Sequence, residues 1–372
     1  MTSLFPTLDP IPLPAPVWLF KVLHDLTLSL HFASLYLLIG GLFLSIAWNM
    51  VGHARKSAVM IEASGAVLSR LPIVMTYVIN LGIPPLLFTQ VLYGRALYTS
   101  SILIGGYWIS VIFAIMAAYG LLYRADKTSA QKRAWWGWGI ASFILVMYVG
   151  RIYSVNMTLM LRPEVWAGMY DTTAMGSHLP PFDPTTTPRF VLMMIGSLAF
   201  GSIGAVLFST KRALNSEVQV FLRVRGGLFA ALGLILLAAT GVWFFESQPD
   251  YVQQGLITSS IYHPLIVGWL VLLGVSALGA LSFLKNPSKL PLIKCLLVAL
   301  PALLAIGNYV VLREGVRDLT LAHKGFDVWQ SPVNCNWMVV ILFVVSLIAG
   351  LAGIAWLIGV IRSAKPAEES YV

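Results

Sequence analysis

Nine long apolar segments, separated by short polar stretches, set the limits on what this chain can fold into. They cover residues 17–51, 70–92, 102–123, 134–161, 188–210, 221–245, 260–284, 290–312 and 336–361. A helix needs about 20 apolar residues to cross a membrane, and each segment is long enough. Barrel strands would alternate apolar and polar residues over about ten positions, whereas these runs are continuous. The sequence therefore predicts an all-α, polytopic membrane helix bundle.

The charged residues support a membrane protein and exclude a nucleic-acid-binding one. Only 10% of the residues are charged and 58% are hydrophobic, which leaves too little charge to cover a soluble domain. The net charge of +9 comes from Lys and Arg in short runs between the apolar segments, with no basic patch interleaved with aromatic residues. We therefore expect membrane lipid, and no nucleic acid, around this chain.

The distribution of Lys and Arg over the loops predicts the topology. Every second loop is short and basic, and by the positive-inside rule these loops are cytoplasmic. Nine crossings then place the N-terminus outside and the C-terminus in the cytoplasm, in a bacterial inner membrane. We expect an extended N-terminal arm over 1–16, a single transmembrane bundle over 17–361 and a cytoplasmic tail over 362–372.

Histidines and methionines gather on the predicted outer side. His24 and His31 lie in the first segment, His263 begins the seventh, and Met193 and Met194 lie near the start of the fifth. His and Met are axial ligands of b-type haems. His24 and His31 are two helical turns apart, roughly 10.5 Å, so they cannot bind opposite faces of one haem. Each His can equally form a hydrogen bond between helices, and Met is a common packing residue.

Arg151 is a cation within the outer half of the fourth segment, where a charge needs a partner. A haem propionate or a quinone oxygen would suit it. An ion pair with Glu164, or extension of the side chain to the membrane interface, would suit it equally well. Glu314 and Arg317, one turn apart, are expected to form a local ion pair.

Several short motifs occur in the same order as in a known family. The first is HFASLYLLIGGLFLSIAWN, which begins at His31, and the next are INLG at 79–82 and NMTLMLRPEVW at 156–166. PRFVLMM at 188–194, FESQPDY at 245–251 and REGVRDLTL at 313–321 follow. Together they resemble the large subunit of cytochrome bd quinol oxidases. The resemblance implies that His31 is a haem ligand.

The sequence also departs from that family at positions that matter for redox chemistry. The second haem-ligating His of the family falls at Leu192, and the family's Met falls near Ile266, one turn from His263. A haem there would have to be rebuilt with His263 and Met193 or Met194. The third segment, 102–123, lacks the acidic residues of the family. A full oxygen-reducing centre is therefore not expected.

The resemblance favours one function among three. The first is a subunit that binds b-type haem and carries electrons between the quinone pool and a c-type cytochrome, or another redox partner, on the outer face. The second is a haem-free anchor or scaffold that binds other subunits of a respiratory complex. The third is a divergent bd-type terminal oxidase. For the first, the expected cofactor-binding residues are His31, His263, His24, Met193, Met194 and Arg151, with His31 and His263 on the iron.

Overall fold

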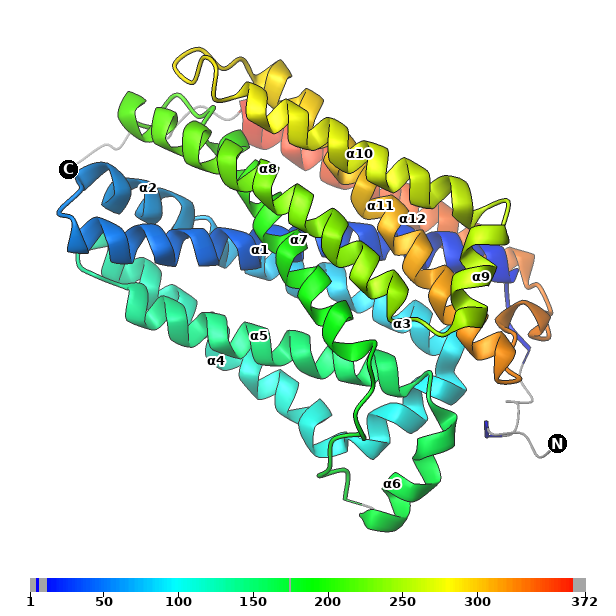
Figure 1. Ribbon diagram of the computed structural model, residues 1–372. Coiled ribbons are helices and arrows are strands. Elements are labelled where there is room, and N and C mark those ends of the chain that lie inside the picture. The colour runs from blue at the N-terminus through cyan, green and yellow to red at the C-terminus, as the bar shows by residue number, and fades with distance from the viewer. Residues whose placement is uncertain (1–4, 7–11, 174, 364–372) are drawn as a thin grey trace, which may run out of the picture.

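The chain is a bundle of long helices in a computed structural model that describes residues 5–6, 12–173 and 175–363 (Figure 1). Extended backbone pairs in this part of the chain only at one bridge, between Leu13 and Val333. The α-helices are α1 (Val17–Ala54), α2 (Ala58–Leu68), α3 (Leu71–Leu103), α4 (Gly105–Ala130), α5 (Trp136–Leu159), α6 (Trp166–Thr172), α7 (Thr186–Phe208), α8 (Ser216–Glu246), α9 (Asp250–Thr258), α10 (Tyr262–Ser282), α11 (Leu292–His323) and α12 (Trp337–Ser363). Two short 3-10 turns, η1 (Pro163–Val165) and η2 (Val328–Gln330), lie in loops.

The predicted membrane bundle is confirmed. Eight helical stretches in the described chain are long and apolar enough to cross a membrane, with α2 and α3 forming one of them. The 27-residue helix α12 is a further apolar helix. Which end faces outward stays a prediction, and we call the end that holds the N-terminal arm the outer end. The predicted tail, 362–372, lies almost entirely outside the described residues.

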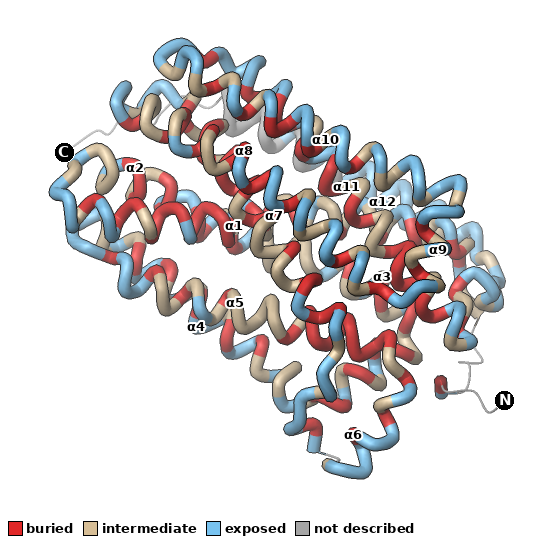
Figure 2. The backbone as a smooth tube through the Cα atoms, viewed as in Figure 1, coloured by how far each residue is buried: buried red, intermediate tan, exposed pale blue. Residues whose placement is uncertain are grey.

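Helix α1 is the central element of the bundle. It packs against α2, α3, α5, α7 and α11, and Figure 2 shows that much of it is buried. In the most apolar stretch of α1, 61% is buried inside the protein. The corresponding share for α4 is 22%, so most of α4 faces lipid. Gly40 lets the backbones of α1 and α7 approach each other closely, because a Cβ atom at this position would lie 1.8 Å from the carbonyl oxygen of Ser197 on α7.

Two differences from the expected segments place polar residues on helices. The basic loop expected before residue 70 contains α2, whose first turn is capped by the hydroxyl of Ser57. Helix α11 continues to His323 instead of ending near residue 312, because its last turns pack against α1 and α9. The acidic and basic residues of the REGVRDLTL motif therefore lie on one rigid helix rather than in a loop.

Helix α3 runs through Pro84 and Pro85 without ending. Its backbone leaves helical geometry further on, at Tyr93, with φ −128° and ψ 25°. Tyr93 is fully buried, and its hydroxyl reaches charged groups on α1 and α11. The bend therefore lies at a polar contact and not at the proline pair.

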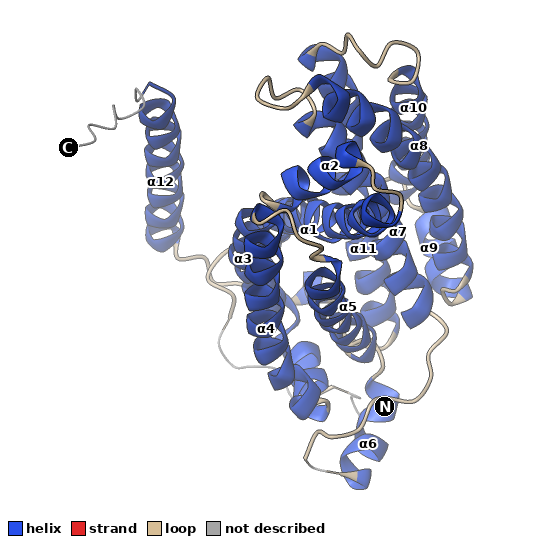
Figure 3. Ribbon diagram, turned by 90° about the vertical axis from the view of Figure 1, so that its left-hand side faces the viewer, coloured by secondary structure: helices blue, strands red, loops and turns tan. Residues whose placement is uncertain are grey.

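Helix α12 stands at the side of the bundle (Figure 3). Its side chains over 337–350 are apolar and almost all exposed, as suits a helix surrounded by lipid. The segment before it is held at the outer end by the N-terminal arm. Leu13 donates its backbone N–H to Pro332 at 2.8 Å, and its carbonyl accepts from Asn334 at 2.9 Å.

Candidate cofactor site

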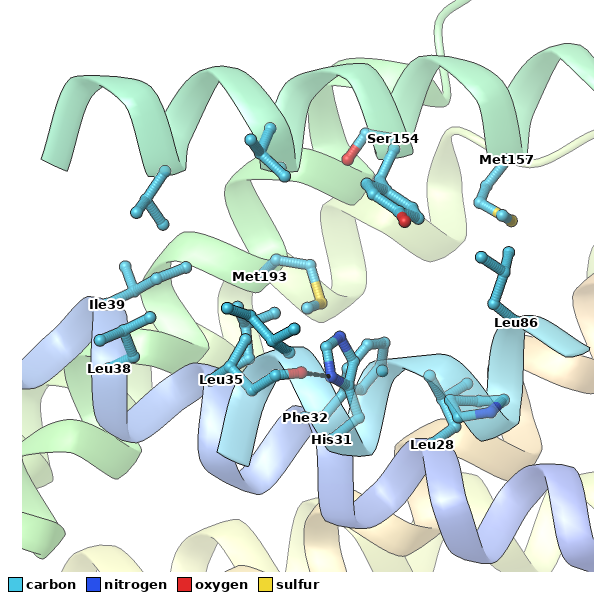
Figure 4. Close-up of a pocket in the computed structure, with 18 of the residues that line it drawn as sticks. Leu28, His31, Phe32, Leu35, Leu38, Ile39, Leu86, Ser154, Met157 and Met193 are labelled. Carbon is cyan, nitrogen blue, oxygen red and sulfur yellow. Dashed lines mark hydrogen bonds between the residues drawn. The ribbon is translucent and has the colours of Figure 1, made fainter. Parts of the chain in front are cut away.

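A cavity of about 320 Å³ lies in the bundle among α1, α3, α4, α5, α7 and α11. Cofactor pockets typically enclose roughly 300–1,000 Å³ and are mostly apolar with a few polar groups. This cavity follows that pattern, since its polar groups are few and gather near the outer end. Figure 4 shows its apolar walls, including Leu28, Leu35 and Leu86, together with His31 and Met193.

His31 on α1 presents one ring nitrogen to this cavity. Its Nδ1 lies 3.1 Å from the backbone carbonyl oxygen of Val78 on α3. A carbonyl oxygen can only accept, so Nδ1 carries the proton and Nε2 of the neutral ring has a free lone pair. The second nitrogen is turned into the cavity in Figure 4. This is the arrangement that orients a metal-binding imidazole.

Glycine at position 82 on α3 makes room for this imidazole. A Cβ atom at Gly82 would lie 2.9 Å from Cε1 and 3.1 Å from Nδ1 of His31. Any larger residue would therefore push the ring away from the Val78 carbonyl. Gly82 belongs to the INLG motif noted in the sequence, so that motif has a steric reason in this fold.

Met193 and Met194 on α7 also line the cavity. The sulfur of Met193 accepts a hydrogen bond from the hydroxyl of Tyr36 at 3.4 Å and lies 4.0 Å from that of Tyr309. A thioether is a weak acceptor, so these contacts orient the sulfur without occupying it fully. His31, Met193 and Met194 therefore line one cavity, whereas the sequence analysis had combined the two methionines with His263.

Two arginines lining the cavity have no acidic partner. Arg189 on α7 and Arg313 on α11 form no ion pair with any described residue. Arg189 is 4% exposed, and its Nε and Nη2 have no hydrogen-bond partner there. An unpaired buried cation inside a membrane is expensive, and an anionic group of a ligand would remove that cost. The cavity is therefore suited to a ligand with carboxylate groups.

A polar network borders the cavity on its outer side. Lys21 and His24 from α1 meet Glu314, Arg317 and Asp318 from α11. Arg317 Nη1 lies 2.9 Å from Glu314 Oε2, which confirms the expected ion pair one turn apart. These charges compensate one another, in contrast to Arg189 and Arg313.

His24 lines the cavity but belongs to this network. Its Nε2 lies 3.1 Å from Thr89 Oγ1, and its Nδ1 lies 3.3 Å from Glu314 Oε1 and 3.4 Å from Asp25 Oδ1. Both ring nitrogens are therefore engaged. Of the alternatives left open by the sequence, the structure favours His24 as a hydrogen-bonding residue rather than a ligand.

His263 and Arg151 lie outside the cavity lining. His263 is exposed at the start of α10, with its backbone N–H bonded to the carbonyl of Ser259. Arg151 on α5 is half-buried, and its guanidinium lies 5.9 Å from the ring centroid of Phe190. Glu164, its suggested partner, pairs instead with Arg162 and Lys324.

The position of the family's second haem ligand is filled by hydrocarbon. Leu192 is 2% exposed and lies in the main core cluster with Trp269 and Phe200. The hollow that these three residues border measures only about 10 Å³. A space of this size holds roughly one water molecule. Where the family has a haem-ligating histidine, this chain therefore has a leucine and no room for a haem.

Sequence reasoning missed Arg189 and Arg313 as site residues. Both lie next to the ends of predicted membrane segments, at Pro188 and residue 312. Arginines in such places usually extend to the membrane interface, so their sequence position is not diagnostic. These two arginines differ from arginines at the membrane interface only because their side chains point into the cavity. That direction depends on how the helices pack and cannot be seen in the sequence.

Replacing Glu314 by Gln is expected to destabilise the folded protein by about 3–5 kcal/mol, because it leaves Arg317 and Lys21 short of a buried counter-charge. Thermal unfolding in detergent measures this loss. The control is Glu164→Gln: that side chain is 48% exposed, so its ion pair with Lys324 should contribute at most about 1 kcal/mol. Equal effects of the two substitutions would contradict a buried, interdependent network.

Comparison with known proteins identifies the fold. No protein-family model matches the sequence, and no curated protein matches it. Among solved structures, the chain is similar to the bd oxidase from Geobacillus thermodenitrificans, with a TM-score of 0.69 and 13% sequence identity, over 95% of this chain and 100% of that one. The resemblance predicted from the motifs is confirmed at the level of the fold. The chain is therefore a divergent multi-pass membrane protein with the fold of bd oxidase.

Proposed function

We propose that the cavity binds one b-type haem and that the chain is an electron-transfer subunit of a respiratory membrane complex. The observation that carries this proposal is the combination of groups facing one apolar cavity. His31 offers a free, oriented nitrogen, and Arg189 and Arg313 offer two unpaired cations. A b-type haem has an iron that takes an imidazole ligand, two carboxylates and a large apolar ring, so these residues fit it.

The residues of this chain would hold and tune such a haem, which supplies a one-electron carrier when bound. His31 would ligate the iron through Nε2, while the Val78 carbonyl fixes its tautomer and raises its basicity. Arg189 and Arg313 would neutralise the propionates. Met193 and Met194, which line the same cavity, would offer thioether sulfurs to the bound group. The apolar walls exclude water and lower the local dielectric, which governs the reduction potential.

The proposed electron path runs between the quinone pool and a redox partner on the outer face, such as a c-type cytochrome. The cavity borders the outer polar network, so an outer partner would approach it closely. On α4, the cavity meets only Ile115 and Ala118, which carry no protonatable group. The residues of α4 at the cavity therefore supply no proton of their own.

Replacing Arg313 by Gln should weaken haem binding by about tenfold or more, because one propionate loses a desolvated charge-assisted hydrogen bond. Haem titration of the haem-depleted protein, followed in the Soret band, measures the affinity. The matched control is Arg151→Gln on α5, which does not line the cavity and should bind haem like the wild type. A larger loss in Arg151→Gln than in Arg313→Gln would move the propionate contact to α5.

A further inference from the structure

A continuous series of side chains, linked by hydrogen bonds and one ion pair, joins the outer surface to the cavity. The Trp329 indole donates to Asp318 at 3.2 Å, and the Tyr93 hydroxyl lies 2.6 Å from Asp318 and 3.0 Å from Glu314. Glu314 lies 3.3 Å from Nδ1 of His24. The series thus crosses from α11 to α3, back to α11 and then to α1.

The two ends of this series face different environments. At the outer end, the side chain of Asp318 is 11% exposed and Trp329, which covers it, is 53% exposed. At the inner end, His24 and Thr89 line the cavity. The links between them measure 2.6 Å (Asp318 to Tyr93), 3.0 Å (Tyr93 to Glu314) and 3.3 Å (Glu314 to His24, an ion pair), so polar groups in contact connect the outer surface with the cavity wall.

The hydrogen-bond directions place a mobile proton at His24. The hydroxyl of Thr89 donates to the carbonyl of Pro85 at 2.8 Å, so its oxygen must accept from His24 Nε2. Nδ1 of the same ring faces two carboxylates, Glu314 and Asp25. Because two acceptors cannot face each other without a proton between them, Nδ1 shares one with a carboxylate. His24 can then take a proton at Nδ1 and release one at Nε2.

Further charged and titratable side chains from α1, α10 and α11 surround this series. Lys21 from α1 contacts Asp318 at 2.6 Å and also bonds to the Tyr93 hydroxyl. Arg317 and Arg313 from α11 lie on the cavity side, and Tyr262 from α10 packs against Gly315. Asp25 flanks His24. The cations hold the carboxylates in place, while the phenol and the imidazole are the groups able to relay a proton.

We propose that Asp318, Tyr93, Glu314 and His24 form a proton path between the outer aqueous phase and the cavity. The inference rests on the proposed redox role of the cavity. One electron delivered to the cavity by the redox partner adds one negative charge. One proton taken up at Asp318 moves through Tyr93 and Glu314 to His24 and compensates it. The proton returns along the same path when the electron leaves.

The test measures proton uptake after rapid reduction of the haem-loaded, full-length protein. A flash-activated flavin donor reduces the haem in vesicles oriented with the outer end exposed, and a pH-indicator dye in the outer medium reports the proton. Tyr93→Phe removes the hydroxyl that bridges Asp318 and Glu314 and keeps the buried ring. We expect uptake to slow at least tenfold. In Tyr148→Phe, which removes a similar hydroxyl 2.6 Å from Ser110 away from this series, uptake should keep its rate.

The outcomes separate this inference from the proposed function. A wild-type protein without haem overturns the proposed function before any proton is measured. A haem-loaded protein whose uptake is equally fast in the wild type and Tyr93→Phe, or comes from the inner side, overturns the proton path alone. Asp318→Asn provides a second variant if Tyr93→Phe does not fold, and the same tenfold slowing is expected.

Discussion

Replacing His31 by Ala is expected to remove the proposed haem, with at least a tenfold fall in haem per chain, while the helix bundle stays folded. The reason is that Nε2 of His31 is the oriented nitrogen in the cavity, and alanine leaves no group to ligate iron. The substitution also leaves the Val78 carbonyl, which is already part of the α3 helix, so little stability is lost. Haem content is measured by the pyridine haemochrome assay and helicity by circular dichroism.

The matched control for this prediction is His263→Ala. His263 is exposed at the start of α10 and does not line the cavity, so the variant should keep its haem. The sequence alone made both histidines candidates for the iron, and the two variants decide between them. Haem retained in His31→Ala but lost in His263→Ala would show that the cofactor lies between α7 and α10 instead.

Replacing Gly40 by Ala abolishes the folded protein or destabilises it by more than about 3 kcal/mol. The new Cβ atom would lie 1.8 Å from the carbonyl oxygen of Ser197 and 2.9 Å from Cα of Gly201, and both atoms belong to the backbone of α7. Backbone cannot rotate away as a side chain can, so α1 and α7 would have to separate. Small residues at such crossings are what let membrane helices pack closely.

The control for this prediction is Gly120→Ala on α4. A Cβ atom there meets nothing within 4 Å, and alanine favours a helix over glycine by up to about 1 kcal/mol. Gly120→Ala should therefore be neutral or slightly stabilising. Thermal unfolding in detergent measures both variants. A Gly40→Ala protein as stable as Gly120→Ala would contradict the contact between α1 and α7.

The helices could be predicted from the sequence because the membrane imposes a simple rule on length and polarity. All nine expected segments correspond to helices, from α1 to α12. The rule says little about helices too short to cross the membrane or about helical turns beyond it, and for that reason α2 and the last turns of α11 lay outside the expected segments. Their helical form depends on packing against α1, which no local pattern encodes.

The site could be predicted only in part. His31 follows from the motif resemblance, and Met193 and Met194 from their position near the start of a helix. His263 and Arg151 have the right chemistry, but no residue of α10 lines the cavity, and α5 lines it with residues other than Arg151. Arg189 and Arg313 show the opposite case. They stand in the motifs PRFVLMM and REGVRDLTL but were not singled out there, yet their side chains line the cavity without an acidic partner among the described residues.

The measurement that tests the central claim most directly is the visible spectrum of the purified wild-type protein. It is recorded as reduced minus oxidised, in mild detergent, together with the pyridine haemochrome assay for haem type and amount. The cavity at His31 and the filled space at Leu192 predict one b-type haem per chain. A colourless protein, isolated with its partners and without loss of cofactor, would contradict the haem assignment and leave a scaffold with the fold of bd oxidase.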